Sequence, residues 1–152
     1  MLKNGITRIL TYSLLSAIGL SCALASNHSS LNGTWALVPT RSNFAGEPMI
    51  QSGSVTITDR EHNIFISKKY NFDGQNTTVN YETSIDGREN SSIREGKTFR
   101  TKAKWEGNEL VVTSSQDNVV TKERYTLNAD GTLTLTEERS GHPVVRLFFE
   151  RQ

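Results

Sequence analysis

Four charged residues alternate with apolar residues along the chain, and they are the groups best placed to do chemistry. They are Lys68, Glu123, Glu137 and Arg139. In an extended segment every second side chain points to the same face, so each of these charges shares a face with apolar neighbours. Polar groups that converge in an apolar setting can orient an amphipathic ligand.

Tyrosines occur in the same registers and extend this candidate site. We interpret these charged and phenolic groups as the polar end of an apolar cavity. The alternative is that the strands extend beyond the core at this point, so that the charges reach solvent or pair with one another. An unpaired buried charge is costly, and the sequence leaves both interpretations open. The candidate ligand-binding residues are Lys68, Tyr70, Tyr81, Glu123, Tyr125 and Arg139.

The sequence contains none of the common catalytic motifs. It has no Gly-x-Ser-x-Gly motif, no phosphate-binding loop, and no histidine paired with a plausible serine or cysteine nucleophile. His28, His62 and His142 are isolated and lack the spacing of a metal site. We therefore expect a protein that is not an enzyme and that uses no cofactor and no metal.

A basic face alternates along one segment, with Arg100, Lys102 and Lys104 beside Trp105. Such a strand could follow single-stranded nucleic acid. The whole chain, however, has 17 basic and 16 acidic residues, so its charge gives no reason to expect a polyanionic partner. We interpret this face as a solvated outer surface that discourages aggregation, and we expect no nucleic-acid partner.

The first residues have the pattern of an export signal. Lys3 and Arg8 precede an uncharged run at 9–20, which is too short to span a bilayer as a helix. The small-x-small sequence Ala23-Leu24-Ala25 follows, as signal peptidases require. The alternative, a buried N-terminal helix, is disfavoured because the next residues are polar. We predict a signal peptide at 1–25, a short linker at 26–31 and one domain at 32–152.

Cys22, the single cysteine, allows a second interpretation of the N-terminus. Gly19-Leu20-Ser21-Cys22 is similar to a bacterial lipobox, although that motif usually has leucine where Gly19 stands. We expect an exported protein, periplasmic or secreted, and the alternative is a lipoprotein anchored to the membrane through Cys22.

From residue 31 onward the hydrophobic period is that of strands. In the segment 98–105, Phe99, Ala103 and Trp105 share one face and the basic residues share the other. Asp-Gly pairs between such segments supply the positive φ that tight hairpins require. The predicted strands are 33–38, 54–59, 63–72, 77–85, 90–94, 98–106, 109–115, 119–128, 132–139 and 143–150.

About ten short strands with short connections predict an all-β, up-and-down antiparallel meander. Closing that sheet into a barrel removes its exposed edges. The alternative, a two-sheet sandwich, needs longer crossovers, and the chain has one long connection, from Pro39 to Gly53. Within that connection we expect one short helical turn, capped by Thr40, that places Phe44 over one end of the barrel.

The segment from Gly33 to Phe44 opens the first strand with Gly-x-Trp and continues with Ser-x-Phe. It resembles the start of calycin barrels, and most of all small bacterial secreted proteins that are lipocalin-like or similar to fatty-acid-binding proteins. In lipocalins this Trp closes the barrel floor against an Arg of the last strand. The resemblance implies that Trp35 has that role, with Arg151 or else Arg146 as its cation–π partner, and that Phe44 belongs to the same floor.

The sequence also departs from these families. It has neither the C-terminal helix nor the disulfide of lipocalins, and residues 39–53 are too few for the two-helix lid of fatty-acid-binding proteins. Those proteins hold a fatty-acid carboxylate with Arg-x-Tyr in the final strand. Here Arg146 is followed by Phe148, so that head-group site does not carry over.

The function expected from the sequence is non-enzymatic binding of a small hydrophobic or amphipathic molecule inside the barrel. The alternative is a barrel filled by its own aromatic side chains, which would contact another envelope protein through loops such as 73–76 or 87–92. A membrane partner is expected only if Cys22 is lipidated.

Overall fold

The computed structural model describes residues 31–94 and 96–152. The predicted signal peptide, the Cys22 motif and nearly all of the predicted linker lie outside these residues. The described elements are β1 (Gly33–Leu37), a 3-10 turn η2 (Pro39–Arg41), β2 (Ser52–Arg60), β3 (Asn63–Phe72), β4 (Gln75–Ser84), β5 (Asn90–Arg94), β6 (Lys97–Glu106), β7 (Glu109–Gln116), β8 (Val119–Leu127), β9 (Leu133–Arg139) and β10 (Val145–Arg151).

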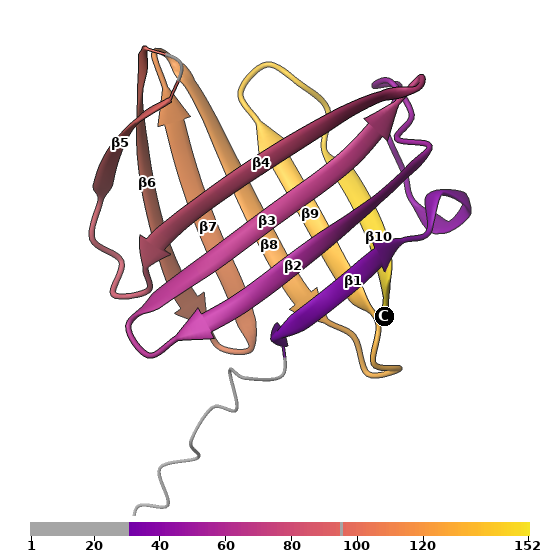
Figure 1. Cartoon of the computed structure of the whole chain (residues 1–152), viewed down its shortest axis with the longest axis horizontal. Helices are drawn as coiled ribbons and strands as arrows, with labels where there is room; N and C mark the ends of the chain where they lie inside the picture. Colours follow the sequence, from indigo (N-terminus) through magenta and orange to yellow (C-terminus); the bar gives the residue numbers. More distant parts are fainter. Residues whose placement is uncertain (1–30, 95) are drawn as a thin grey trace, which may run out of the picture.

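The ten strands form a single antiparallel sheet that curls into a nearly closed barrel (Figure 1). The strand order is β4-β3-β2-β1-β10-β9-β8-β7-β6-β5, so each strand pairs with its sequence neighbour and β1 joins β10. The sheet begins with β4 and ends with β5, and the barrel closes where β4 contacts β6, the neighbour of β5. The predicted all-β barrel is confirmed, and the sandwich is excluded because all described strands belong to one sheet.

The core fills one end of the barrel, which we call the Trp35 end and which is lower in Figure 1. Trp35, Tyr125 and Phe149 are fully buried there, and β-branched and leucine side chains from the adjoining strand halves complete the layer. At the other end, the open end, the inward residues Phe72, Val79 and Phe99 are partly exposed. Ile50 and Leu147 extend the core toward the open end, where the other inward residues are packed less completely.

Trp35 closes its end through one contact at the edge of the indole ring and one over its face. Its Nε1–H donates a hydrogen bond to the backbone oxygen of Leu31 at 3.0 Å. The guanidinium of Arg151 lies 4.3 Å from the ring centroid and donates to the backbone oxygen of Asn32 at 2.7 Å. Arg151 is therefore the cation–π partner of Trp35, whereas Arg146 is exposed on the outer face of β10.

Two expectations about the long connection are wrong. Thr40 does not cap the helical turn, because the turn starts at Pro39 with Val38 as its N-cap and no side chain bonds there. Phe44 does not belong to the barrel floor. β1 crosses toward the open end before the turn, and Asn43 then bridges to Arg146, so Phe44 lies at the end opposite Trp35.

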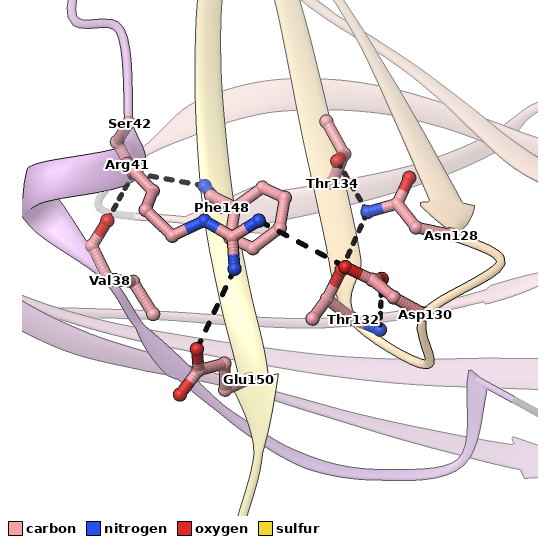
Figure 2. A network of polar contacts seen from close by, with 9 residues as sticks. All are labelled: Val38, Arg41, Ser42, Asn128, Asp130, Thr132, Thr134, Phe148 and Glu150. Carbon is pink, nitrogen blue, oxygen red and sulfur yellow. Dashed lines mark hydrogen bonds and ion pairs between the residues drawn. The ribbon is translucent and has the colours of Figure 1, made fainter.

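A cluster of polar contacts fixes the turn to the outside of the barrel (Figure 2). The guanidinium of Arg41 stacks on the ring of Phe148 at 3.6 Å and lies 3.7 Å from Glu150 and 4.0 Å from Asp130. The hydroxyl of Ser42 donates to the oxygen of Val38 at 3.0 Å and accepts from the N–H of Phe148 at 2.9 Å. These contacts set where the connection that carries Phe44 re-enters the barrel mouth.

We expect the Arg41→Ala variant to lose about 1 kcal/mol of unfolding free energy, mainly through the lost stacking on Phe148. The exposed ion pairs of Arg41 should add little, because solvent screens them. Urea denaturation measures the change. Arg60→Ala is the matched control, since Arg60 stacks on Phe65 at the longer distance of 5.4 Å and pairs with Glu82. An equal cost in both variants would contradict the special role of the Arg41 stack.

Candidate ligand-binding site

A buried ionic cluster crosses the barrel interior between the packed core and the open end. Its members are Lys68 on β3, Tyr81 on β4, and Glu123 and Tyr125 on β8. Each sits at an inward position of its strand because the side-chain period of two places it in the register of the apolar residues. Curling the sheet then brings β3 and β4 opposite β8, which they do not touch in the ladder.

Every oxygen of the central carboxylate has a partner. The ammonium of Lys68 pairs with Oε1 of Glu123, and the hydroxyls of Tyr81 and Tyr125 donate to Oε2 at 2.7 and 2.8 Å. The two hydroxyls also lie 3.3 Å apart. Lys68 and Glu123 are 8% and 5% exposed, so this is a buried pair with its hydrogen bonds satisfied. The ion pair and these hydrogen bonds offset the free-energy cost of burying the two charges.

The cluster shifts the pKa values of its carboxyl and phenol groups in opposite directions. Burial by itself would raise the pKa of Glu123, but the charge and hydrogen bond of Lys68 and the two tyrosine hydroxyls hold that pKa below its ordinary value. Burial, reinforced by the charge of Glu123, raises the pKa values of Tyr81 and Tyr125 well above the ordinary value. At neutral pH the carboxylate is therefore ionised and both phenols remain hydrogen-bond donors.

A polar chamber of about 450 Å³ lies on the open side of this cluster. Lys68, Tyr81 and Glu123 contribute to its lining, and hydroxyl-bearing residues of β6, β7 and β8 line its walls. The exposed residues Lys97, Asp117 and Arg139 also line it, so it opens toward solvent at the barrel mouth.

An apolar chamber of about 330 Å³ lies beside it, under the connection between β1 and β2. Its lining includes Phe44, Ile50, Phe72 and Leu147, together with Tyr70. The two chambers share lining residues Val79, Glu137 and Arg139, which places them next to each other in one mouth. The mouth therefore combines an apolar wall with a charged and hydroxyl-rich wall.

Glu137 lies at the junction of the two chambers. Burial raises the pKa of its carboxyl group; Lys68 opposes that rise and the charge of Glu123 adds to it. Arg139, two residues further along β9, is exposed and also lines both chambers. Glu137 is therefore an inward carboxylate that Lys68, already paired with Glu123, does not fully compensate.

The structure brings together some of the residues that the sequence singled out and separates others. Lys68, Tyr81 and Glu123 meet at the floor of the polar chamber. Tyr125 is 0% exposed and lies beneath them, outside the lining of either chamber. Arg139 stands at the mouth.

Tyr70 belongs to the apolar chamber. The apolar lining from the long connection was missed, because Pro48 and Ile50 lie in a segment without strand periodicity. The one signal in the sequence was Ile50 itself, an apolar residue among residues typical of turns. That the six candidate residues contact a ligand stays a prediction.

Other kinds of site find no support within residues 31–94 and 96–152. No group of histidine, cysteine, aspartate or glutamate side chains in this part could hold a metal ion. On the outer face, Arg100 pairs with Glu89 and Lys104 with Glu106, so carboxylates accompany part of the basic face. Among the described helices, none is long and apolar enough to cross a membrane.

The barrel is similar to several solved structures. Secretory abundant heat soluble protein 4 from Ramazzottius varieornatus superposes with a TM-score of 0.62 at 15% identity, over 82% of this chain and 96% of that one. Lipid binding protein 8 from Caenorhabditis elegans gives 0.60 at 14%, over 82% and 96%. A Schistosoma mansoni fatty acid binding protein, solved with arachidonic acid, gives 0.59 at 16%, over 82% and 98%.

The protein has the calycin-like barrel fold. This confirms the resemblance seen in the Gly-x-Trp segment. Identities of this size concern the fold alone, and neither a protein-family model nor a curated protein sequence matches the chain. Within this calycin-like barrel, one 3-10 turn occupies the connection between β1 and β2. Arg146 is exposed on the outer face of β10, so it adds no charge to the interior.

Proposed function

We propose that this protein binds a small amphipathic molecule, without chemistry, in the open end of its barrel. The observation that carries the proposal is the division of the interior into a solid core and a hollow mouth. The most tightly packed part of the interior ends at the cluster of Lys68, Tyr81, Glu123 and Tyr125. Beyond it lie chambers of about 450 and 330 Å³, the second lined in part by the core residues Ile50 and Leu147. Ligand pockets in proteins start at roughly 300 Å³.

The character of the two chambers supports an amphipathic ligand. The apolar chamber offers aromatic and aliphatic surface to a hydrocarbon part, while the polar chamber offers charges and hydroxyls to a head group. The similar structures include a lipid binding protein and a fatty acid binding protein, which agrees with a ligand of this kind. A barrel filled by its own aromatic residues agrees less well, because the filling is confined to the Trp35 end. Export through residues 1–25 stays a prediction.

Filling the junction of the chambers tests the proposal. Val79 lines both chambers, so Val79→Trp should occupy the space that a ligand needs. We expect at least a tenfold weaker affinity for Prodan, a neutral dye whose fluorescence reports an apolar environment, with the thermal midpoint retained within a few degrees. Dye titration by fluorescence measures the affinity.

The neighbouring position supplies the matched control. Thr78 is exposed on the outer face of β4, so Thr78→Trp adds the same side chain to the same strand without entering the barrel. Its Prodan affinity should equal that of the wild type. Equal loss in both variants, or no saturable dye binding by the wild type, would overturn the proposal.

A further inference from the structure

The apolar chamber contains a buried hydrogen-bond donor without a protein partner. The hydroxyl oxygen of Tyr70 is buried and has no hydrogen-bond partner among the described residues. Its ring packs edge-on against Phe72 with centroids 6.2 Å apart, so the side chain is held by apolar contacts. A buried hydroxyl without a partner costs free energy, and such groups are rare in folded proteins.

The backbone keeps Tyr70 in this place. Tyr70 pairs across the ladder with Gly53 of β2. A Cβ atom at position 53 would lie 2.6 Å from the Tyr70 ring and 2.7 Å from the backbone oxygen of Lys69. Glycine therefore lets the ring lie directly on the neighbouring strand, with its hydroxyl buried in the interior. The unpaired hydroxyl follows from a tightly packed position rather than from a loose side chain.

The charges around this hydroxyl select the kind of partner. Burial raises the pKa of Tyr70 well above its ordinary value, and the negative charges of Glu123 and Glu137 add to the rise. Tyr70 therefore remains a donor at all moderate pH values. A ligand carboxylate placed here would lie beside Glu137, which lines the same chamber, and would be repelled further by Glu123, which already holds Lys68. A hydroxyl group can accept from Tyr70 and can also donate to a carboxylate, which a carboxylate ligand cannot do.

We propose that Tyr70 is the head-group contact of the apolar chamber and that its ligand is an uncharged, hydroxyl-bearing apolar molecule rather than a fatty-acid anion. The inference rests on the proposed function and adds the class of ligand. The hydrocarbon part of that ligand packs against Phe44, Phe72 and Leu147, and its hydroxyl accepts the hydrogen bond of Tyr70. Glu137 and Arg139 both line this chamber, but Arg139 is exposed at the mouth whereas Glu137 is partly buried, so the inner part of the chamber is unfavourable for a second negative charge.

Competition between 1-decanol and decanoate for Prodan tests the inference at pH 7.5. We expect the wild type to bind 1-decanol at least tenfold more tightly than decanoate. Tyr70→Phe keeps the ring and removes only the hydroxyl, so it should weaken 1-decanol binding roughly three- to tenfold, the range of one hydrogen bond. It should leave decanoate binding unchanged. The ligand-free variant should also melt at a higher temperature, because the unpaired hydroxyl is gone.

Tyr81→Phe is the matched control, because it removes an interior hydroxyl that is already bonded to Glu123. It should lower the melting temperature, opposite in sign to Tyr70→Phe. Unchanged 1-decanol affinity in Tyr70→Phe, or tighter binding of decanoate than of 1-decanol, would overturn the inference and leave the proposed function standing. Failure of the wild type to bind Prodan and 1-decanol would overturn both.

Discussion

The Lys68→Met variant should lose about 3–5 kcal/mol of unfolding free energy, the cost of breaking a buried ion pair from one side. The methionine fills similar space, so packing changes little. Glu123 would stay buried with only the hydroxyls of Tyr81 and Tyr125 as partners. Urea denaturation followed by tryptophan fluorescence measures the loss.

The double variant Lys68→Met with Glu123→Gln separates charge from packing. Glutamine keeps an acceptor for the tyrosine hydroxyls but carries no charge, so the double variant should recover most of the stability that Lys68→Met loses. Lys104→Met is the surface control, since Lys104 pairs with Glu106 on the outer face at 2.8 Å and is 56% exposed. A loss in Lys68→Met no larger than in Lys104→Met would show that the buried pair does not hold the two sides of the barrel together.

The same pair predicts how stability depends on pH. The pKa of Glu123 is lowered in the folded protein, because Lys68 and the tyrosines outweigh the effect of burial. Its contribution is therefore complete above the ordinary value of 4.5 and is lost as the pH falls through the lower folded value. The wild type should lose stability below that pH more steeply than the double variant. Equal slopes in acid denaturation would contradict this assignment.

The second large effect is expected at the closed end, where Trp35→Ala should cost about 3–5 kcal/mol of unfolding free energy. Trp35 is 0% exposed, so truncation leaves a cavity in the core. It also removes the donor to Leu31 and the ring beneath Arg151. Thermal and urea unfolding measure the cost, and a variant that does not fold at 25 °C would mean that the cost is at least the whole stability of the wild type.

Trp105→Ala is the matched control, because Trp105 is the second of the two tryptophans and is only partly buried. We expect a clearly smaller loss there. Trp35→Phe, which keeps an aromatic ring, should retain wild-type Prodan affinity, since Trp35 does not line either chamber. A cost in Trp105→Ala equal to that in Trp35→Ala would contradict the role of Trp35 as the closing residue.

The strands and their inward faces could be predicted from the sequence because both are local properties. Alternation with period two and the Asp-Gly turns placed every strand end within two residues of the observed one, and the bounds of Asn63–Phe72 and Asn90–Arg94 are the same in both. Phe99, Ala103 and Trp105 share the inward face for the same reason. Residues outside that periodicity, such as Leu31 and Ile50, are buried in the core although their surroundings showed no pattern.

Which inward residues meet was decided by the closure of the barrel. Lys68 and Glu123 are 55 positions apart and belong to strands that are not neighbours in the sheet, so no local pattern could pair them. Phe44 lies at the end opposite Trp35 for another reason, because β1 crosses the barrel before the turn and Asn43 then pairs with Arg146.

The sequence by itself determined that these strands have one apolar face interrupted by a few charges and tyrosines, because side-chain alternation is a property of each extended segment. Only the tertiary structure decided that the Trp35 end is tightly packed, that Lys68 and Glu123 pair across the interior, and that Tyr70 is left unpaired beside an apolar chamber. All three features depend on the curvature and the register of the whole sheet, to which each of the ten strands contributes.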